Sequence, residues 1–171
     1  MIMKRLTLLL LFALTAVIGY SQIDYQRKIE IGYLRYQYNT VQVDPGPNWN
    51  GYNLDGENGI DLNVINGLTF RDKVFTGIGL GYLNFEGIHG FSIFADIEYL
   101  PLKTKLTPFV NLKIGYNHIW NQYENGTGSA LEEMGLGLNF GLTEKVDIYL
   151  QSGFLMTQQS LIIPIRLGLK F

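Results

Sequence analysis

The 171-residue sequence contains no cysteine. Disulfide bonds and a lipid anchor attached to cysteine are therefore both excluded. Charged side chains are scarce as well, because Asp, Glu, Lys and Arg together make up only 16% of the residues, against about a quarter in an ordinary soluble domain. Glycine is abundant, with 20 residues, and aromatic residues account for 13%. This composition indicates that much of the protein surface faces something other than water.

Helix-like hydrophobic patterning is confined to the first 21 residues. Lys4 and Arg5 precede an apolar run from Leu6 to Ile18, which is shorter than the roughly 20 residues that a membrane-spanning helix needs. The tripeptide Gly-Tyr-Ser at residues 19–21 has the small-x-small pattern of a cleavage site. We therefore expect a signal peptide at residues 1–21 and a single domain at residues 22–171.

Basic residues do not dominate any part of the chain. The whole sequence holds 15 acidic and 13 basic residues, and loss of Lys4 and Arg5 with the signal peptide makes the balance more acidic. A nucleic-acid partner is therefore not expected. The segment 53–61, Asn-Leu-Asp-Gly-Glu-Asn-Gly-Ile-Asp, has oxygen ligands on alternate residues, but it lacks the spacing and the bidentate glutamate of an EF-hand. A solvated turn is the better interpretation, and no metal or cofactor is predicted.

After residue 22 the apolar residues recur at every second position, as they do in strands with one apolar face. In the last nine residues, IPIRLGLKF, each apolar Ile, Leu or Phe alternates with Pro, Arg, Gly or Lys. Eight such segments are separated by turn-forming residues: 27–38, 59–70, 74–85, 91–100, 108–119, 131–142, 146–156 and 161–171. Arg35 shares the apolar parity of the first segment, so it should mark a bulge or lie at the level of lipid headgroups.

The connections between these segments differ with their position in the chain. Those after the second, fourth and sixth segments are tight and polar, those after the first and fifth are long, and those after the third and seventh are short. The asymmetry between the tight turns and the two long connections predicts an all-β, eight-stranded antiparallel up-and-down transmembrane β-barrel, with short periplasmic turns and longer external loops. A soluble lipocalin-like barrel would show the same alternation with its apolar face turned inward around a ligand.

Two features favour the membrane barrel over the soluble one. The polar face consists mainly of Gly, Asn, Gln and Ser, which suits a narrow lumen. Aromatic residues on the apolar face gather near the segment ends, as in the girdles of membrane barrels. One ring would contain Tyr33, Tyr82, Tyr116 and Phe154, and the other Phe70, Tyr99, Phe140 and Phe171.

Three phrases, GIGLGY at 77–82, PFVNLKIGY at 108–116 and IPIRLGLKF at 163–171, resemble the small eight-stranded outer-membrane barrels of the OmpA and OmpX kind. The chain is similar in particular to the single-domain outer membrane protein β-barrel families of Bacteroidota. The resemblance implies a monomer in the outer membrane of a Gram-negative bacterium, in contact with lipid and lipopolysaccharide. Leu167, Leu169 and the terminal Phe171 resemble the signal that the barrel assembly machinery recognises.

Charged residues on the inward parity are expected to close the lumen as a buried charge network. Buried charges are tolerated only when they are paired, and an eight-stranded barrel leaves just enough room for side chains. Antiparallel pairing should place Asp147 opposite Lys170, and closure of the barrel should place Glu30 beside Gly168, diagonal to Arg166. The predicted network contains Glu30, Asp96, Glu98, Lys113, Asp147, Arg166 and Lys170.

Three functions fit this fold. The first is a non-enzymatic barrel that acts as an envelope component or binds an unnamed external ligand through its loops, with Trp49 and Tyr52 as possible contacts. The second is a narrow pore or transporter for small or apolar solutes. The third is a lipid-modifying enzyme, which would need His, Ser and a carboxylate within reach of one another. His118 lacks an adjacent H-x-S pattern and His89 precedes Ser92 by three residues, so no catalytic residue is predicted.

Overall fold

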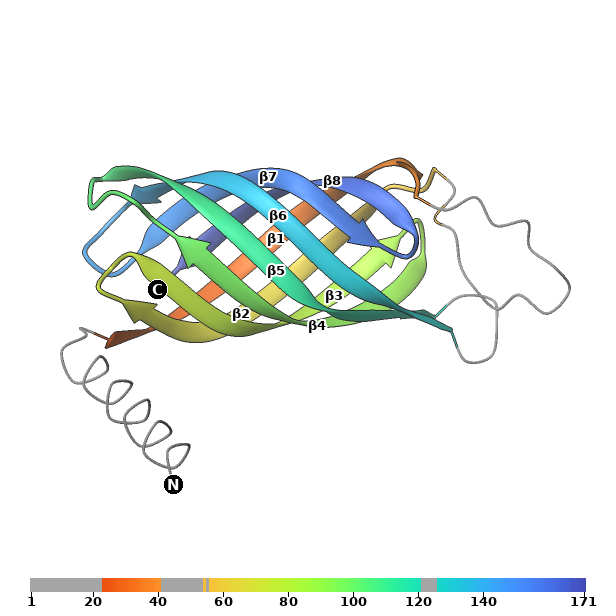
Figure 1. Cartoon of the computed structure of the whole chain (residues 1–171), viewed down its shortest axis with the longest axis horizontal. Coiled ribbons are helices and arrows are strands. Elements are labelled where there is room, and N and C mark those ends of the chain that lie inside the picture. Colours follow the sequence, from red (N-terminus) through yellow and green to blue (C-terminus); the bar gives the residue numbers. More distant parts are fainter. Residues whose placement is uncertain (1–22, 41–53, 55, 121–125) are drawn as a thin grey trace, which may run out of the picture.

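The computed structural model describes residues 23–40, 54, 56–120 and 126–171. Each strand pairs antiparallel with the next, and β8 pairs with β1, so that the sheet closes into a barrel (Figure 1). The predicted all-β, eight-stranded antiparallel barrel is confirmed. Its strands are β1 (Ile23–Asn39), β2 (Gly59–Phe70), β3 (Val74–Phe85), β4 (Ile88–Tyr99), β5 (Leu106–Trp120), β6 (Thr127–Gly141), β7 (Asp147–Thr157) and β8 (Ser160–Lys170).

The alternation of side chains creates the two faces of the barrel wall. Along β2, Ile60, Leu62 and Val64 are exposed on the outside, whereas Asp61 and Asn63 are buried inside. Successive side chains of a strand point to opposite faces of the sheet. The period of two in the sequence therefore becomes an apolar exterior and a largely polar interior.

The ends of the strands differ from the prediction by up to four residues. β1 and β6 begin earlier than expected, at Ile23 and Thr127. Pairing continues through polar hairpin residues, such as Asn117 opposite Ser129, because backbone hydrogen bonds do not require apolar side chains. The hydrophobic pattern therefore underestimates strand length. Arg35 is exposed, and the register of β1 against β8 shifts just beyond it, between Tyr36 and Tyr38.

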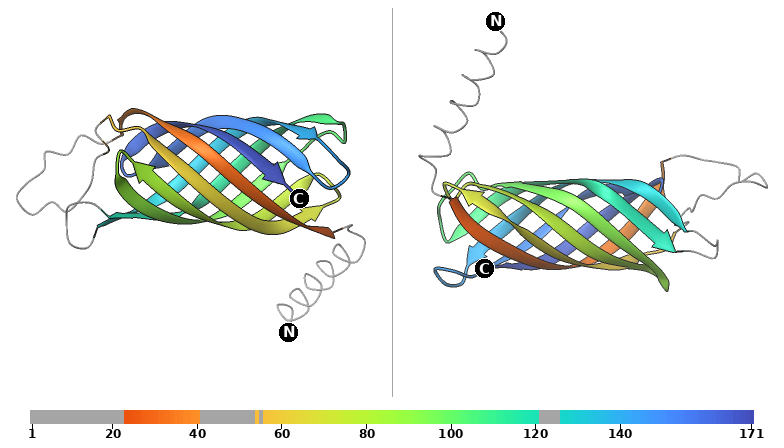
Figure 2. Two further views of the ribbon diagram at one scale, coloured as in Figure 1. Left: turned by 180° about the vertical axis from the view of Figure 1, so that it is seen from behind. Right: turned by 90° about the horizontal axis from the view of Figure 1, so that it is seen from below.

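The barrel has two distinct ends. The connections 71–73, 100–105 and 142–146 lie at one end together with Ile23 and Phe171, and we call this the turn end (Figures 1 and 2). The C-terminal ends of β1, β3, β5 and β7 lie at the opposite end, which we call the loop end. Reciprocal backbone hydrogen bonds of 2.8 and 3.0 Å join Arg27 to Phe171 at the turn end. The described residues contain no helix long and apolar enough to cross a bilayer.

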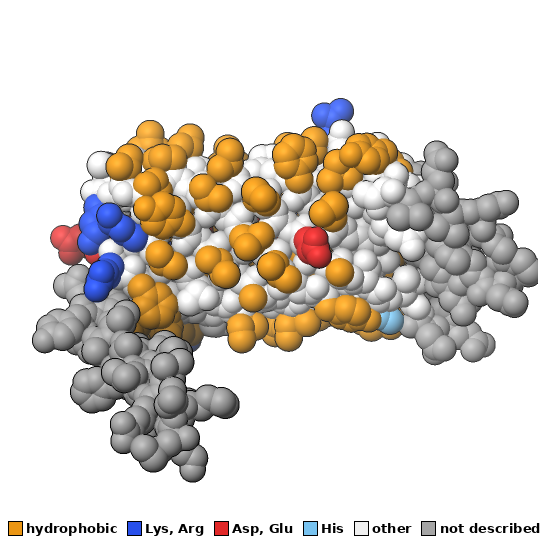
Figure 3. Space-filling model, in the orientation of Figure 1, with side chains coloured by type: hydrophobic (Ala, Val, Ile, Leu, Met, Phe, Trp, Pro, Cys, Tyr) orange, Lys and Arg blue, Asp and Glu red, His pale blue; other side chains and the backbone are white. Residues whose placement is uncertain are grey.

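The outer wall carries a broad band of exposed apolar side chains (Figure 3). Ile78, Leu136 and Leu150 are each more than half exposed, and a contiguous apolar surface of this kind normally faces lipid or a partner. The aromatic residues predicted for the two girdles are exposed, except that Phe70 is only half-exposed. The soluble barrel with an inward apolar face is therefore wrong, and the arrangement is that of a membrane barrel.

Candidate functional site: the barrel lumen

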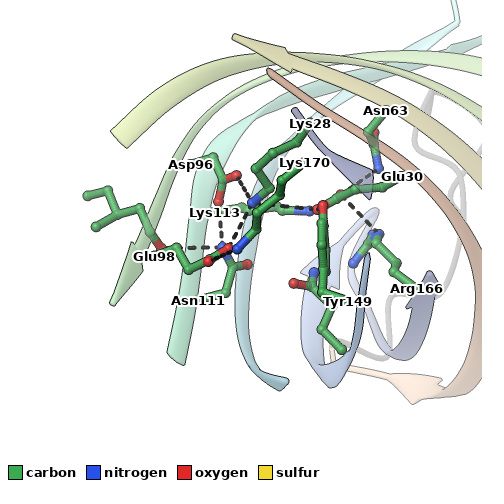
Figure 4. A network of polar contacts seen from close by, with 12 residues as sticks. Lys28, Glu30, Asn63, Asp96, Glu98, Asn111, Lys113, Tyr149, Arg166 and Lys170 are labelled. Atoms are coloured by element: carbon green, nitrogen blue, oxygen red, sulfur yellow. Dashed lines mark hydrogen bonds and ion pairs between the residues drawn. The ribbon is translucent and has the colours of Figure 1, made fainter. Parts of the chain in front are cut away.

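Nine charged side chains of the described residues lie buried inside the barrel, each no more than 3% exposed. They come from six of the eight strands. Each occupies a position that alternates with the outward-facing apolar residues of its strand, so its side chain points inward. Their hydrogen bonds and ion pairs run across the lumen from strand to strand (Figure 4). The nine residues are Lys28, Glu30, Asp61, Asp96, Glu98, Lys113, Glu133, Arg166 and Lys170.

Four of them form a balanced group toward the turn end, which we call the turn-side quartet. The Lys28 amine lies 2.7 Å from Asp96 Oδ2 and 3.0 Å from Glu98 Oε2. The amine of Lys170 donates to the other carboxylate oxygen of Glu98. Asn111 Nδ2 donates to Asp96 Oδ1. Two cations thus face two carboxylates, and all four carboxylate oxygens have partners.

The other five form a second group, the central cluster, around Arg166. The guanidinium lies 2.6 Å from Asp61 Oδ2 through Nη2 and donates through Nη1 to Glu133. Glu30 is held mainly by Lys113, whose amine donates to Glu30 Oε2, and lies 4.0 Å from Arg166 Nε. A contact of 3.8 Å between Lys28 and Glu30 joins the central cluster to the turn-side quartet.

Tyr149 packs between the two groups of charges. Its hydroxyl donates to Glu30 Oε1 at 2.7 Å, and the amines of Lys28 and Lys170 lie 5.2 and 4.9 Å from the centre of its ring. Such cation–π contacts are stronger in a desolvated site than at a surface. The ring fits because Gly168 faces it: a Cβ at position 168 would lie 2.2 Å from Tyr149 Cζ. Tyr149 therefore fills space in the lumen and also serves as a hydrogen-bond donor.

Six of the seven predicted network residues lie in these groups, and the seventh lies at their edge. Asp147 is opposite Lys170 in the register, and Glu30 is opposite Gly168. Asp147 is half-buried and accepts a hydrogen bond from Asn139 Nδ2 at 2.9 Å. Arg166 also lies near Glu30, as expected, but its Nε is 4.0 Å from the Glu30 carboxylate. The guanidinium forms its direct hydrogen bonds with Asp61 and Glu133.

Three members of the network were missed by the sequence reasoning. Lys28, Asp61 and Glu133 all have inward parity, so the alternation that indicated Glu30 was sufficient to find them. Lys28 lies two residues before Glu30, and Asp61 ends the segment 53–61, for which the sequence predicts a solvated turn. In the structure Asp61 lies inside the barrel against Arg166, which rules out its predicted solvated position.

Apolar side chains fill the lumen toward the loop end, where the sequence predicted a polar interior. Near these strand ends apolar residues occupy both parities, so the alternation no longer distinguishes the inner face. Leu54, from the long connection after β1, is fully buried in this group. We call these residues the loop-end apolar cluster: Leu34, Leu54, Leu83, Phe85, Ile119, Leu131, Leu155 and Ile162.

The turn end opens into a recess of about 590 Å³ lined by residues that include Asp24, Thr69, Asp147 and Lys170. Lys170 belongs to the turn-side quartet, so the recess reaches the charged interior from one side. The quartet, the central cluster and the loop-end apolar cluster lie between this recess and the loop end. Side chains thus occupy the lumen through most of the described barrel, as expected for eight strands.

Within the described residues, neither histidine contacts both a hydroxyl and a carboxylate in a catalytic arrangement. His89 is exposed on the outer wall, whereas Ser92, three residues later, is buried in the lumen. The His89 imidazole contacts the Tyr82 hydroxyl and the Asn84 amide. His118 lies on the outer wall with Nδ1 3.5 Å from the Tyr116 hydroxyl. A hydrolytic triad needs a hydroxyl, an imidazole and a carboxylate in contact, and these histidines do not provide one.

The remaining predicted sites fall on the outer wall or outside the described residues. Leu167, Leu169 and Phe171 are exposed on the outer face of the last strand and just beyond it. Trp49 and Tyr52, and the signal peptide at 1–21, lie outside the described residues. Among the residues that the structure describes, no group of three or more His, Asp or Glu side chains is placed to hold a metal ion.

No protein-family model and no curated protein matches this sequence. Solved structures are similar in fold. Neisserial surface protein A has a TM-score of 0.66 and 10% identity, over 86% of this chain and 97% of that one. The N-terminal β-barrel domain of Pseudomonas aeruginosa OprF has a TM-score of 0.57 and 16% identity, over 88% and 100%. The outer membrane enzyme PagL has a TM-score of 0.50 and 14% identity, over 85% and 98%.

Identities this low establish a fold and not an activity. One of these similar structures is an enzyme, so the fold alone decides neither for nor against catalysis. The closed sheet, the apolar outer wall and the similar structures agree with one another. The chain is therefore a closed eight-stranded antiparallel β-barrel with the fold of the small outer-membrane barrels.

Proposed function

We propose that the protein is a non-enzymatic barrel of the outer membrane with a closed lumen, which contacts the outside of the cell through its loop end. The observation that carries this proposal is the packed lumen. Nine buried charges in mutual contact and the loop-end apolar cluster occupy the space that a pore would need. Their arrangement supports a structural or binding role over transport.

The proposal includes the route to the membrane. Residues 1–21 would be removed during export, and the barrel assembly machinery would insert the barrel as a monomer surrounded by lipid and lipopolysaccharide. The apolar outer wall supports the lipid contact, and the outward series of Leu167, Leu169 and Phe171 supports recognition of β8 during insertion. The turn end would face the periplasm, because short turns lie on that side of known outer-membrane barrels.

The long connection after β1 is the proposed place of external contact. Leu54 is buried in the loop-end apolar cluster, and the Asn58 side chain accepts a hydrogen bond of 3.1 Å from the Tyr36 N–H. These two residues fix the end of the connection on the barrel. Trp49 and Tyr52 precede these two residues in the chain, and we keep them as the proposed contacts for a partner, because large aromatic side chains offer contact area at a low entropic cost.

Surface labelling of intact Gram-negative cells tests the proposed location and orientation. An epitope inserted between Trp49 and Tyr52 should bind antibody on intact cells. As a control, the same epitope inserted between Lys103 and Thr104, at the turn end, should bind antibody only after the cells are permeabilised. The reverse pattern, or labelling of neither epitope before permeabilisation, would contradict the proposal.

The absence of enzymatic activity is tested separately, because the similar structure PagL is an enzyme. Mass spectrometry of lipid A from cells that express the barrel should give the same species as cells with an empty vector. A change in acylation that disappears in a His118→Ala or His89→Ala variant would instead assign a lipid-modifying activity to the outer wall.

A further inference from the structure

A small cavity lies beside the central cluster. Its polar lining includes the carboxylates of Asp61 and Glu133, the hydroxyl of Ser92 and the cations Lys113 and Arg166, and its apolar lining includes Leu131 and Leu155. The cavity volume is about 10 Å³, which is room for one water molecule or one ion of similar size.

Three buried oxygen atoms of residues around this cavity have no hydrogen-bond partner among the described residues. They are Asp61 Oδ1, Ser92 Oγ and Glu133 Oε2, and their side chains belong to residues no more than 3% exposed. Buried polar atoms in native proteins nearly always have a partner, and an unfilled requirement points to a bound water or ion. Glycine at position 81 leaves room for Ser92 Oγ, since a Cβ there would lie 2.3 Å from it.

The charges of the lumen do not balance at this point. The nine buried residues comprise five carboxylates and four cations. The turn-side quartet is neutral, with two of each. The central cluster therefore has three carboxylates, Glu30, Asp61 and Glu133, against the two cations Lys113 and Arg166. Among the residues that the structure describes, one negative charge of the central cluster has no buried cation to balance it, and the two unpartnered carboxylate oxygens belong to this cluster.

We infer that the cavity binds a single monovalent cation of the size of Na⁺ or K⁺, held by the free oxygens of Asp61, Glu133 and Ser92. Carboxylate and hydroxyl oxygens are suitable ligands for hard cations of this kind. One positive charge neutralises the central cluster, whereas a water molecule could accept or donate hydrogen bonds there without supplying charge. A divalent ion would leave the cluster positive, and the described residues lack a group of three acidic or histidine ligands for one.

The consequence is a barrel whose stability depends on the identity of the cation and not only on ionic strength. A ligand that binds the folded state alone raises the ratio of folded to unfolded protein in proportion to its concentration once that concentration exceeds Kd. A tenfold rise in Na⁺ or K⁺ above Kd should therefore raise this ratio about tenfold. The inference rests on a closed lumen. If the cation does not change the stability, the proposal of a closed lumen still stands. If the lumen is open, a steady current through the barrel in a lipid bilayer shows it.

The test uses the full barrel domain refolded in detergent micelles at constant pH and constant chloride concentration. Thermal unfolding is followed while Na⁺ or K⁺ replaces tetramethylammonium, which is too large for the cavity. The unfolding temperature of the wild type should rise with Na⁺ or K⁺. Equal unfolding temperatures in all three salts would overturn the inference and assign the cavity to water alone.

Variants show whether the effect arises in this cavity. Glu133→Gln removes the excess charge and should abolish the cation dependence. The control, Asp147→Asn, removes a half-buried carboxylate outside the cavity and should retain the full dependence. A dependence that persists unchanged in Glu133→Gln would overturn the inference. If Glu133→Gln does not fold, Ser92→Ala serves instead. The Na⁺ concentration at which the unfolding temperature begins to rise should then be several-fold higher than in the wild type. An unchanged concentration would count against the site.

Discussion

The amine of Lys28 on β1 lies 2.7 Å from Asp96 Oδ2 on β4, across the lumen from it. The two residues are 68 positions apart in the chain and both are fully buried. A direct ion pair between opposite walls leaves no space for a water-filled passage at that height. It also makes each charge dependent on the other, because an isolated charge in such an environment is strongly unfavourable.

Replacement of Lys28 by Met should lower the free energy of unfolding by about 3–5 kcal/mol, because it leaves Asp96 and Glu98 with only the Lys170 amine between them. Urea unfolding in detergent, followed by tryptophan fluorescence, measures the loss. Lys103→Met is the matched control, since Lys103 pairs with Asp72 at 2.7 Å with both side chains about half exposed; its loss should not exceed about 1 kcal/mol. Equal losses in the two variants would show that burial of the network is unimportant.

Arg166 should depend on Asp61 more than on Glu30. Arg166→Leu is expected to cost about 3–5 kcal/mol. Adding Asp61→Leu should recover part of that loss, because Asp61 bonds directly to the guanidinium. Adding Glu30→Leu should recover less, because it removes the carboxylate to which the Lys113 amine donates and leaves that amine buried without it. Double-mutant cycles for the two pairs measure the difference, and a larger recovery with Glu30 would refute this assignment of partners.

Gly168 should be intolerant of a side chain. Gly168→Val would force Tyr149 to move, since the added Cβ would lie 2.2 Å from its ring, and the hydrogen bond to Glu30 would be lost with it. We expect a loss of about 1–3 kcal/mol, as for other overpacked interiors. Gly141→Ala is the control, because its nearest neighbour would be 3.5 Å away, and urea unfolding should detect little change. Similar losses at both positions would argue against the packing role of Tyr149.

The parity of the sequence was sufficient to place Glu30 and Arg166 inside the barrel and to set the register of neighbouring strands. Asp147 opposite Lys170 follows from counting residues back from the connection between β7 and β8. Contacts across the lumen were not predictable in this way. Whether Lys28 meets Asp96 depends on how far the tilted strands slide past one another around the barrel, and one sequence carries no direct signal for that displacement.

The loop-end apolar cluster also escaped prediction, for a different reason. Leu34 and Leu155 have inward parity but lie near strand ends, where outward residues such as Tyr33 and Phe154 are apolar too. Where adjacent residues are both apolar, the sequence shows no period of two, and the pattern does not indicate which side chains face the lumen. Leu54 belongs to a connection, and its burial depends on how that connection folds back on the barrel.

Phe171→Asp should reduce the amount of barrel in the outer membrane while export into the periplasm continues. Phe171 is exposed on the outer wall at the turn end and pairs with Arg27 through its backbone. A charge near the membrane interface costs at most about 1 kcal/mol, so a severe loss of yield would reflect failed assembly. Leu102→Asp, an exposed apolar residue in a turn at the same end, is the control. Fractionation and immunoblotting measure both variants; equal outer-membrane yields of the Phe171 variant and the wild type would contradict this role.

Single-channel recording in planar lipid bilayers tests the closed lumen most directly. The purified wild-type barrel should give no steady conductance, with an open general porin in the same membranes as the positive control. Short, irregular current fluctuations are compatible with a closed barrel. A steady, ohmic conductance that changes in Lys28→Met or Arg166→Leu would contradict the account, because it would show that these charges line an open pore.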